Sequence, residues 1–392
     1  MLRFGVSCGN QPARTVRSMP PLAQRNLFHD KVRLTVTLTG IVFSVVLIVV
    51  QLGLFLGFTT ATSNLIDHSN ADLWITSRNV PYVEQGVAFS ERKLNQVRAV
   101  PGVADAQKII AHWTQWKRHD GGHESVQIVG INIDDPIERP WNLVEGRVED
   151  LKSPDAVILD ELYKQKLGVS HIGEVFEIGG YRARVVGFTR GIRSFTTSPY
   201  VFTSFKNAQD YTAVREDQTM FILVRVADGA DVEQVRRELL DRVKDVDVLT
   251  TARFSRMTTF YWMFTTGAGV AVLIAAVLGL VVGFVVVAQT IYATTMDHIR
   301  EFGTLKAMGA PNSYVYKVIM KQAAISAVIG YALGMVVSVF VVEGSQKGGA
   351  AILMPLPMAV GMFFLTLTMC VGAALVSINK VTHIDPAMVF KG

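Results

Sequence analysis

LTVTLTGIVFSVVLIVVQLGLFLGF, residues 34–58, carries no charged side chain, and the next charge after it is Asp67. A helix needs about 20 apolar residues to cross the hydrocarbon core of a bilayer. The stretch is too long, and starts too far from Met1, for a cleaved signal peptide. It therefore predicts a first transmembrane helix.

Three more apolar runs follow this stretch. Residues 257–296 are uncharged, but a helix of that length would exceed a hydrocarbon core about 30 Å thick, so we place the second span within residues 260–291. The third run covers residues 322–342, and the fourth covers residues 357–378, after the break Pro355-Leu356-Pro357. The predicted fold class is a membrane protein with four transmembrane α-helices and a large extracytoplasmic α+β domain inserted between helices 1 and 2.

Composition agrees with this class. Half of the residues are hydrophobic, 18% are charged, and mean hydropathy is +0.32, whereas charged residues make up about a quarter of a typical soluble protein. The net charge is +5, and much of the basic excess flanks apolar runs, which indicates orientation in a bilayer rather than nucleic-acid binding. Cys8 and Cys370 should lie far apart, so we expect no disulfide and no cysteine metal site.

Lys and Arg in the short loops set the predicted orientation. Basic residues are dense before the first span, between spans two and three, and after span four, whereas the loop between spans three and four has only Lys347. Such residues mark the cytoplasmic side, so both termini should be cytoplasmic and the chain should lie in the cell inner (plasma) membrane. The predicted segments are a cytoplasmic tail and interfacial helix (1–33), span one (34–58), an external domain (59–259), span two (260–291), a cytoplasmic loop (292–321), span three (322–342), a short external loop (343–356), span four (357–378) and a cytoplasmic C-terminus (379–392).

The external domain has strands and helices in alternation. Two strands flank Asp120-Gly121-Gly122, two more flank Gly179-Gly180, and residues 221–249 read as strand, helix and strand. We predict an α+β domain with lobes near residues 88–135 and 136–250.

One cluster in this domain has metal-ligand chemistry. His112, His119 and His123 lie close together in the sequence, and zinc uses such ligands. The alternative is a solvated hairpin tip, which we favour because the turn is rich in glycine and charge. We therefore expect no metal site, and an enzymatic role for the external domain is the least favoured function.

The loop after span two contains a second pattern. Ile299, Phe302, Leu305 and Met308 recur at helical spacing, with Asp297, Arg300, Glu301 and Thr304 on another face. An amphipathic helix at the cytoplasmic surface has two interpretations: it docks into a soluble partner, or it lies in the lipid headgroups.

REFGTLKAMGA, residues 300–310, resembles the coupling-loop signature R-E-(I/F)-G-(I/T)-L-(R/K)-A-(I/M)-G-A of the MacB/FtsX permease superfamily. Other stretches are similar to the same superfamily: residues 25–41 before and within span one, parts of residues 146–187, and Asp385-Pro386-Ala387 near the C-terminus. The size and the lack of a fused ATPase look most like DevC-type permeases. Met19 is an alternative start, because residues 1–18 match nothing in the family.

The resemblance implies a function and partners. The chain would be the non-catalytic permease subunit of an ABC exporter, would bind no cofactor itself, and would leave ATP to a separate ABC ATPase. The coupling helix implied by the family carries over onto Arg300, Glu301, Phe302, Leu305, Lys306 and Met308. Further implied partners are a second permease protomer in a homodimer, a periplasmic adaptor (membrane fusion) protein, a TolC-like outer-membrane channel and membrane lipid, with no nucleic acid.

Two rival functions belong to the same superfamily. One is lipoprotein release, as in LolC and LolE, and the other is signalling to a cell-wall hydrolase, as in FtsX. The external insert of about 200 residues argues for export, because FtsX usually has a smaller domain.

Small-residue faces that permit close helix packing occur in three spans, at Gly53 and Gly57, Gly279 and Gly283, and Gly330 and Gly334.

Overall fold

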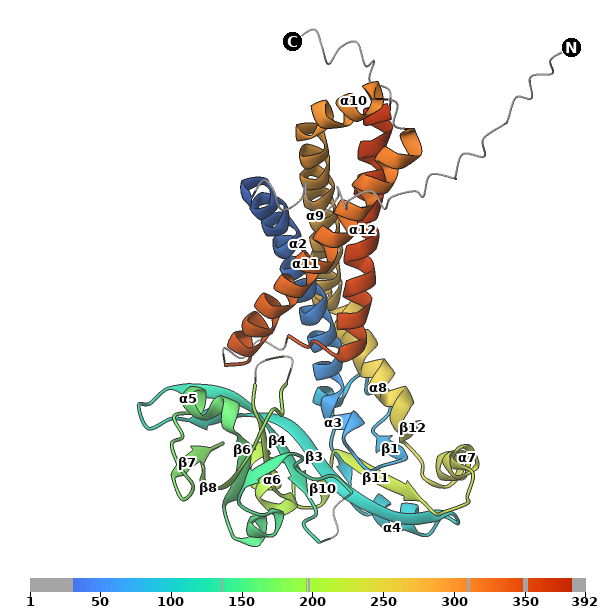
Figure 1. The fold of residues 1–392 in the computed structure, drawn as a ribbon. Coiled ribbons are helices and arrows are strands. Elements are labelled where there is room, and N and C mark those ends of the chain that lie inside the picture. Colours follow the sequence, from blue (N-terminus) through green and yellow to red (C-terminus); the bar gives the residue numbers. More distant parts are fainter. Residues whose placement is uncertain are drawn as a thin grey trace, which may run out of the picture. The chain divides into compact units, whose positions relative to one another are not determined.

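The structure is a computed structural model of the chain (Figure 1). It describes residues 31–134, 137–194, 196, 198–308, 311–347 and 352–382. The predicted N-terminal tail before residue 31, the alternative start at Met19 and the C-terminal Asp385-Pro386-Ala387 therefore lie outside the described residues.

Four helices are long and apolar enough to cross a membrane, as the sequence predicts. They are α2 (Lys31–Thr62), α9 (Ala268–Asp297), α11 (Asn312–Lys347) and α12 (Leu356–Thr382). Their apolar parts are Leu34–Thr62, Ala268–Asp297, Asn312–Ser345 and Leu356–Val376. The fold class is confirmed: the chain is a four-span membrane protein with a large α+β domain between the first two spans.

The second span begins later than its apolar run. The run enters through α8 (Thr251–Phe260), continues as a π-helix (Tyr261–Thr265), and becomes the α-helix α9 only at Ala268. Gly267, immediately before α9, has a φ of +76°. A left-handed residue cannot continue a right-handed helix, so the helical run is interrupted at the entry to the span.

The chain divides into two compact units, which are described separately. One falls within residues 1–48, 279–338 and 355–392, and contains most of the membrane helices. The other comprises residues 49–278 and 339–354, and contains the external domain. The boundary between the units lies within α2, α9 and α11.

The external domain is built of short helices and strands. Its helices are α3 (Asn64–Asp67), η1 (Val83–Gln85), α4 (Lys93–Arg98), η2 (Val148–Lys152), η3 (Glu161–Tyr163), α5 (Lys164–Leu167), α6 (Phe205–Thr212) and α7 (Val232–Arg242). Its strands are β1 (Leu73–Thr76), β2 (Phe89–Ser90), β3 (Val103–Lys117), β4 (His123–Ile131), β5 (Leu143–Glu145), β6 (Ala156–Asp160), β7 (Val175–Ile178), β8 (Tyr181–Thr189), β9 (Tyr200–Ser204), β10 (Gln218–Thr219), β11 (Phe221–Val226) and β12 (Asp247–Thr250).

Strand β3 joins the two parts of the main sheet. The strand order is β12-β1-β11-β3-β4-β9-β6-β8-β5, with β7 paired to β3 and β8. The first half of β3 pairs with β11, up to Ile109, and the second half pairs with β4, from Ile110 onward. Figure 1 shows β3 as one long strand that runs through both parts.

The predicted lobe boundaries at residues 88–135 and 136–250 are wrong. Strands from both ends of the domain, β1, β11 and β12, lie together on one side of β3. Leu73 and Ile75 of β1 belong to one apolar core, and Trp74 belongs to the other. Because alternate side chains of a strand point to opposite faces, both faces of this sheet region are covered, which explains the unbroken apolar run of β1.

The two predicted hairpins are present. Lys117 of β3 pairs with His123 of β4 across the Asp120-Gly121-Gly122 turn. Ile178 pairs with Tyr181, which leaves Gly179 and Gly180 as a two-residue loop with φ values of +56° and +89°. Positive φ at both central residues is typical of a type I′ turn, whose twist matches that of the strands.

Candidate functional site

The loop after the second span forms the helix that the sequence predicts. Helix α10 (Ile299–Ala307) follows α9, which ends at Asp297, after one intervening residue (Figure 1). Helix α11 then begins at Asn312. A helix tied this closely to two spans can pass a displacement directly to both of them.

His298 contacts the carboxylate of Glu301, one of the residues that the sequence predicts for the coupling helix. The His298 ring is buried, and its Nδ1 lies 3.0 Å from Oε1 of Glu301. The Glu301 side chain is still 51% exposed, so it can also meet a partner. Sequence reasoning missed His298, which directly precedes α10 and lies three residues before Glu301 in the sequence.

The remaining residues of the predicted coupling helix divide into two groups. Arg300 is exposed, and Met308 is 71% exposed despite being apolar. The side chains of Phe302, Leu305 and Lys306 lie outside the described part of the chain. Their proposed contact with an ATPase stays a prediction.

Helix α2 packs against α11 where α11 has its two glycines. A Cβ added to Gly330 would lie 2.5 Å from Cγ2 of Ile41, and one added to Gly334 would lie 2.9 Å from Cβ of Val45. Both distances are shorter than side chains tolerate. The absence of a side chain at these two positions therefore lets the helices approach closely, as in other membrane proteins.

Helix α2 also packs against α9. A Cβ on Gly283 would lie 2.8 Å from Cδ1 of Ile48. Elsewhere between the same two helices, the hydroxyls of Thr37 and Thr294 lie 2.9 Å apart, and Thr37 is only 1% exposed. An interhelical hydrogen bond between hydroxyls adds to helix association in lipid.

The other predicted packing glycines are buried as well. A Cβ on Gly53 would lie 2.6 Å from Cγ2 of Ile352, and Gly53 accepts a hydrogen bond from the backbone of Leu353 at 3.1 Å. Gly57 and Gly279 are buried. On α11, the Tyr331 hydroxyl donates to the carbonyl of Ala359 on α12 at 2.8 Å.

The three histidines of the external domain do not converge. His112 lies within β3 opposite Ile128, His119 packs on the ring of Phe176 with centroids 4.4 Å apart, and His123 opens β4. Among the described residues, no three His, Cys, Asp or Glu side chains lie close enough to hold a metal ion. Burial lowers the pKa of His112, which favours its neutral form.

Comparison with known families decides the classification. The MacB-like periplasmic core domain matches residues 34–242, more than half of the chain, and the FtsX-like permease C-terminal domain matches residues 255–386. This chain belongs to the MacB/FtsX superfamily of ABC transporter permeases. The two domains meet between residues 242 and 255, shortly before the second span, so the predicted resemblance is confirmed. The DevC-type subtype stays a prediction.

Two relatives match this permease over most of its own length. It is 23% identical over 380 residues to the uncharacterized ABC transporter permease Rv0072 of Mycobacterium tuberculosis, which covers 94% of this chain and 99% of that protein. It is 22% identical over 335 residues to the macrolide export ATP-binding/permease protein MacB of Nitrosomonas europaea, covering 81% of this chain and 50% of that protein. The periplasmic region of MacB from Actinobacillus actinomycetemcomitans matches 48% of this chain and 93% of that structure, at 12% identity and a TM-score of 0.36.

Proposed function

We propose that this permease relays the ATP-driven motion of a separate ABC ATPase to its external domain, which expels substrate on the far side of the membrane. The observation that carries the proposal is the placement of α10, whose exposed Arg300 and Glu301 stand between two membrane spans. In this scheme α10 docks into the ATPase. The alternative is that α10 lies in the lipid headgroups, a role that would not require short connections to α9 and α11.

The spans support a relay rather than a polar channel. The predicted spans, residues 34–58, 260–291, 322–342 and 357–378, contain no Asp, Glu, Lys, Arg or His. A pathway for a hydrophilic solute through the bilayer normally includes such residues. We therefore propose that substrate is taken up and released on the external side. We further propose that the permease forms a homodimer. It would work in a tripartite efflux system with a periplasmic adaptor and an outer-membrane channel.

The first prediction concerns topology. The proposed scheme puts the termini and α10 in the cytoplasm and the external domain outside. A reporter that is active only outside the cytoplasm should work when fused at Gly121, a hairpin position where an added Cβ meets nothing within 4 Å. The same reporter should be silent when fused after Gly309, which lies outside the described residues. Activity at Gly309 would refute the orientation.

The second prediction concerns ATP. The sequence contains no G-x-x-x-x-G-K-[ST] loop to bind nucleotide phosphates, and Gly344–Gly348 has the wrong spacing. The purified permease should therefore show no ATP hydrolysis above background, and hydrolysis should appear when its ATPase is added. A phosphate-release assay on the chain alone tests this, with a sample from cells that lack the permease as control. Robust turnover by the chain alone would contradict the subunit assignment.

A further inference from the structure

The connection between the external domain and the second span is interrupted. The π-helix Tyr261–Thr265 separates α8 from α9, and Gly267 adds a left-handed residue directly before α9. A π-helical turn inside a helical run is costly and often marks a functional site. This break is the point at which the helix leaving the external domain can change direction.

A segment of the external domain covers the break. Residues 77–90, here called the strap, follow β1 and include η1 and β2. The ring of Tyr82 stacks on Tyr261 with centroids 4.1 Å apart and an interplanar angle of 22°, and it meets Trp262 edge-on at 5.2 Å. Trp262 Nε1 donates to Oε2 of Glu84 at 3.4 Å. The strap therefore contacts the π-helix through ring stacking and through the long hydrogen bond from Trp262 to Glu84.

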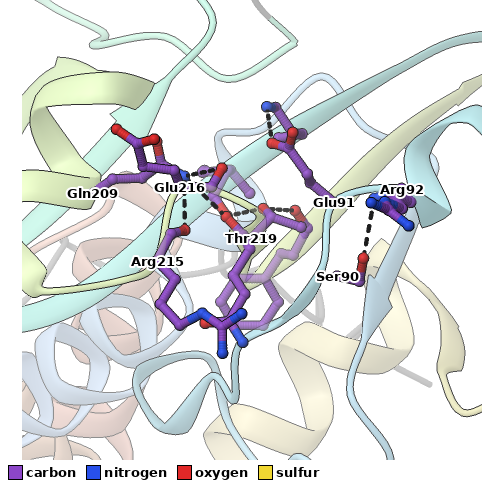
Figure 2. Close-up of polar contacts among 11 residues, drawn as sticks. Ser90, Glu91, Arg92, Gln209, Arg215, Glu216 and Thr219 are labelled. Carbon is purple, nitrogen blue, oxygen red and sulfur yellow. Dashed lines mark hydrogen bonds and ion pairs between the residues drawn. The ribbon is translucent and has the colours of Figure 1, made fainter.

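Hydrogen bonds and strand pairing hold both ends of the strap. The Ser77 hydroxyl donates to the carbonyl of Val87 at 2.8 Å. At the far end, Ser90 of β2 pairs with Gln218 of β10. Figure 2 shows how the segment around β10, which pairs with this end, is held: the Gln209 amide donates to three backbone carbonyls, and the Thr219 hydroxyl donates to the backbone of Ile109.

Glu84 is poorly matched to this position if it is charged. The residue is only 4% exposed, and its Oε1 is buried without a hydrogen-bond partner in the part of the chain that the structure describes. The titratable groups around it are Tyr82 from the strap, Tyr261 from the π-helix and Tyr200 from β9. Glu138, a second buried carboxyl, interacts electrostatically with the same Tyr200. A buried carboxylate without a cation is strongly disfavoured, whereas a neutral carboxyl is tolerated.

We propose that Glu84 is the proton-sensitive residue of a latch, in which its neutral carboxyl keeps the strap on the π-helix and its ionisation releases the strap. This role goes beyond the proposed function, because it concerns what controls the junction between domain and span. In the proposed topology Glu84 lies on the external side of the membrane, so the pH of the medium reaches it.

The direction of the pH effect follows from the pKa. Burial raises the pKa of Glu84 from 4.5 to about 7, and the hydrogen bond from Trp262 opposes this shift. In the released strap, water would restore the ordinary pKa. The docked state is therefore fully favoured below pH 4.5 and loses its advantage as the pH rises through 7. By linkage, the released fraction should increase about tenfold between pH 6 and pH 8.

Hydrogen exchange of the full-length permease in lipid nanodiscs tests the latch. The reporter is the peptide around Gln85, whose amide donates to the carbonyl of Tyr82 in the docked strap. After correction for the intrinsic pH dependence of exchange, its opening should rise about tenfold from pH 6 to pH 8. Glu84→Gln, which is permanently neutral, should keep the peptide protected and remove the pH dependence.

Two further variants make the test specific. Glu138→Gln changes another buried glutamate that has no partner for its carboxyl oxygens among the described residues, and it should leave the tenfold effect intact. Trp262→Phe removes the hydrogen bond that stabilises the ionised carboxylate, so the midpoint of release should move to higher pH. A wild-type strap whose corrected exchange is equal at pH 6 and pH 8, or a Glu84→Gln variant that keeps the tenfold change, would overturn the proposal.

Discussion

Phe302→Ala should weaken assembly of the permease with its ABC ATPase about 30-fold, and Glu301→Lys should uncouple ATP hydrolysis from export. An apolar anchor at an interface hot spot contributes about 2 kcal/mol or more, which corresponds to about 30-fold in affinity. Phe302 is the largest apolar side chain of α10 in the sequence. Co-purification with the ATPase measures the first effect, and export from cells measures the second.

The expected effect of Glu301→Lys has a different origin. Glu301 is half exposed and is held by His298, so its charge is presented in a fixed position. Charges at the edge of an interface set register and partner choice, and a reversed charge places like charges together. The variant should thus assemble partly, hydrolyse ATP and fail to export.

A matched control is available on α11. Glu343 is exposed and lies 31 residues after the first residue of that helix, which is about 45 Å along its axis at the usual helical rise. Glu343→Lys makes the same charge change far from α10, and it should leave assembly and export unchanged. If Phe302→Ala and Glu301→Lys both assemble and export like the wild type at normal expression, α10 has no coupling role.

Gly330→Leu should destabilise the membrane helices by about 3 kcal/mol. The first added carbon would already lie 2.5 Å from Cγ2 and 2.8 Å from Cβ of Ile41, so α2 and α11 must move apart. Overpacking of this kind typically costs about 1–3 kcal/mol, and a leucine is much larger than the methyl group that fails to fit. Unfolding of the purified permease in mild detergent, by heat or by titration with a denaturing detergent, measures the loss.

Two variants separate packing from a general effect of leucine. Gly361→Leu on α12 should be nearly neutral, because a Cβ there meets nothing within 4 Å. Ile41→Ala in the Gly330→Leu background should recover part of the stability, since the two changes share one contact. Equal stability of Gly330→Leu and Gly361→Leu would show that the α2–α11 contact is not as close as the structure has it.

The sequence alone determined the four spans, because a bilayer admits only long uncharged helices and this requirement is local. It also determined the hairpin at Gly179-Gly180, whose turn needs residues that accept positive φ. The small-residue faces of the spans were visible as well. The sequence did not show which helix packs on each of these faces, because the spacing of glycines identifies a surface and not its neighbour.

The tertiary structure decided the arrangement of the external domain. The sequence predicted an α+β domain, but the lobe boundaries were wrong, because β1 pairs with β11 and β12, strands from the other end of the domain. Pairing between distant strands leaves no signal in the local pattern of apolar residues. Glu84 could not be identified from the sequence for the same reason. Its neighbours in sequence are ordinary for an exposed loop, and only the fold brings Trp262, 178 residues away, into contact with its carboxyl group.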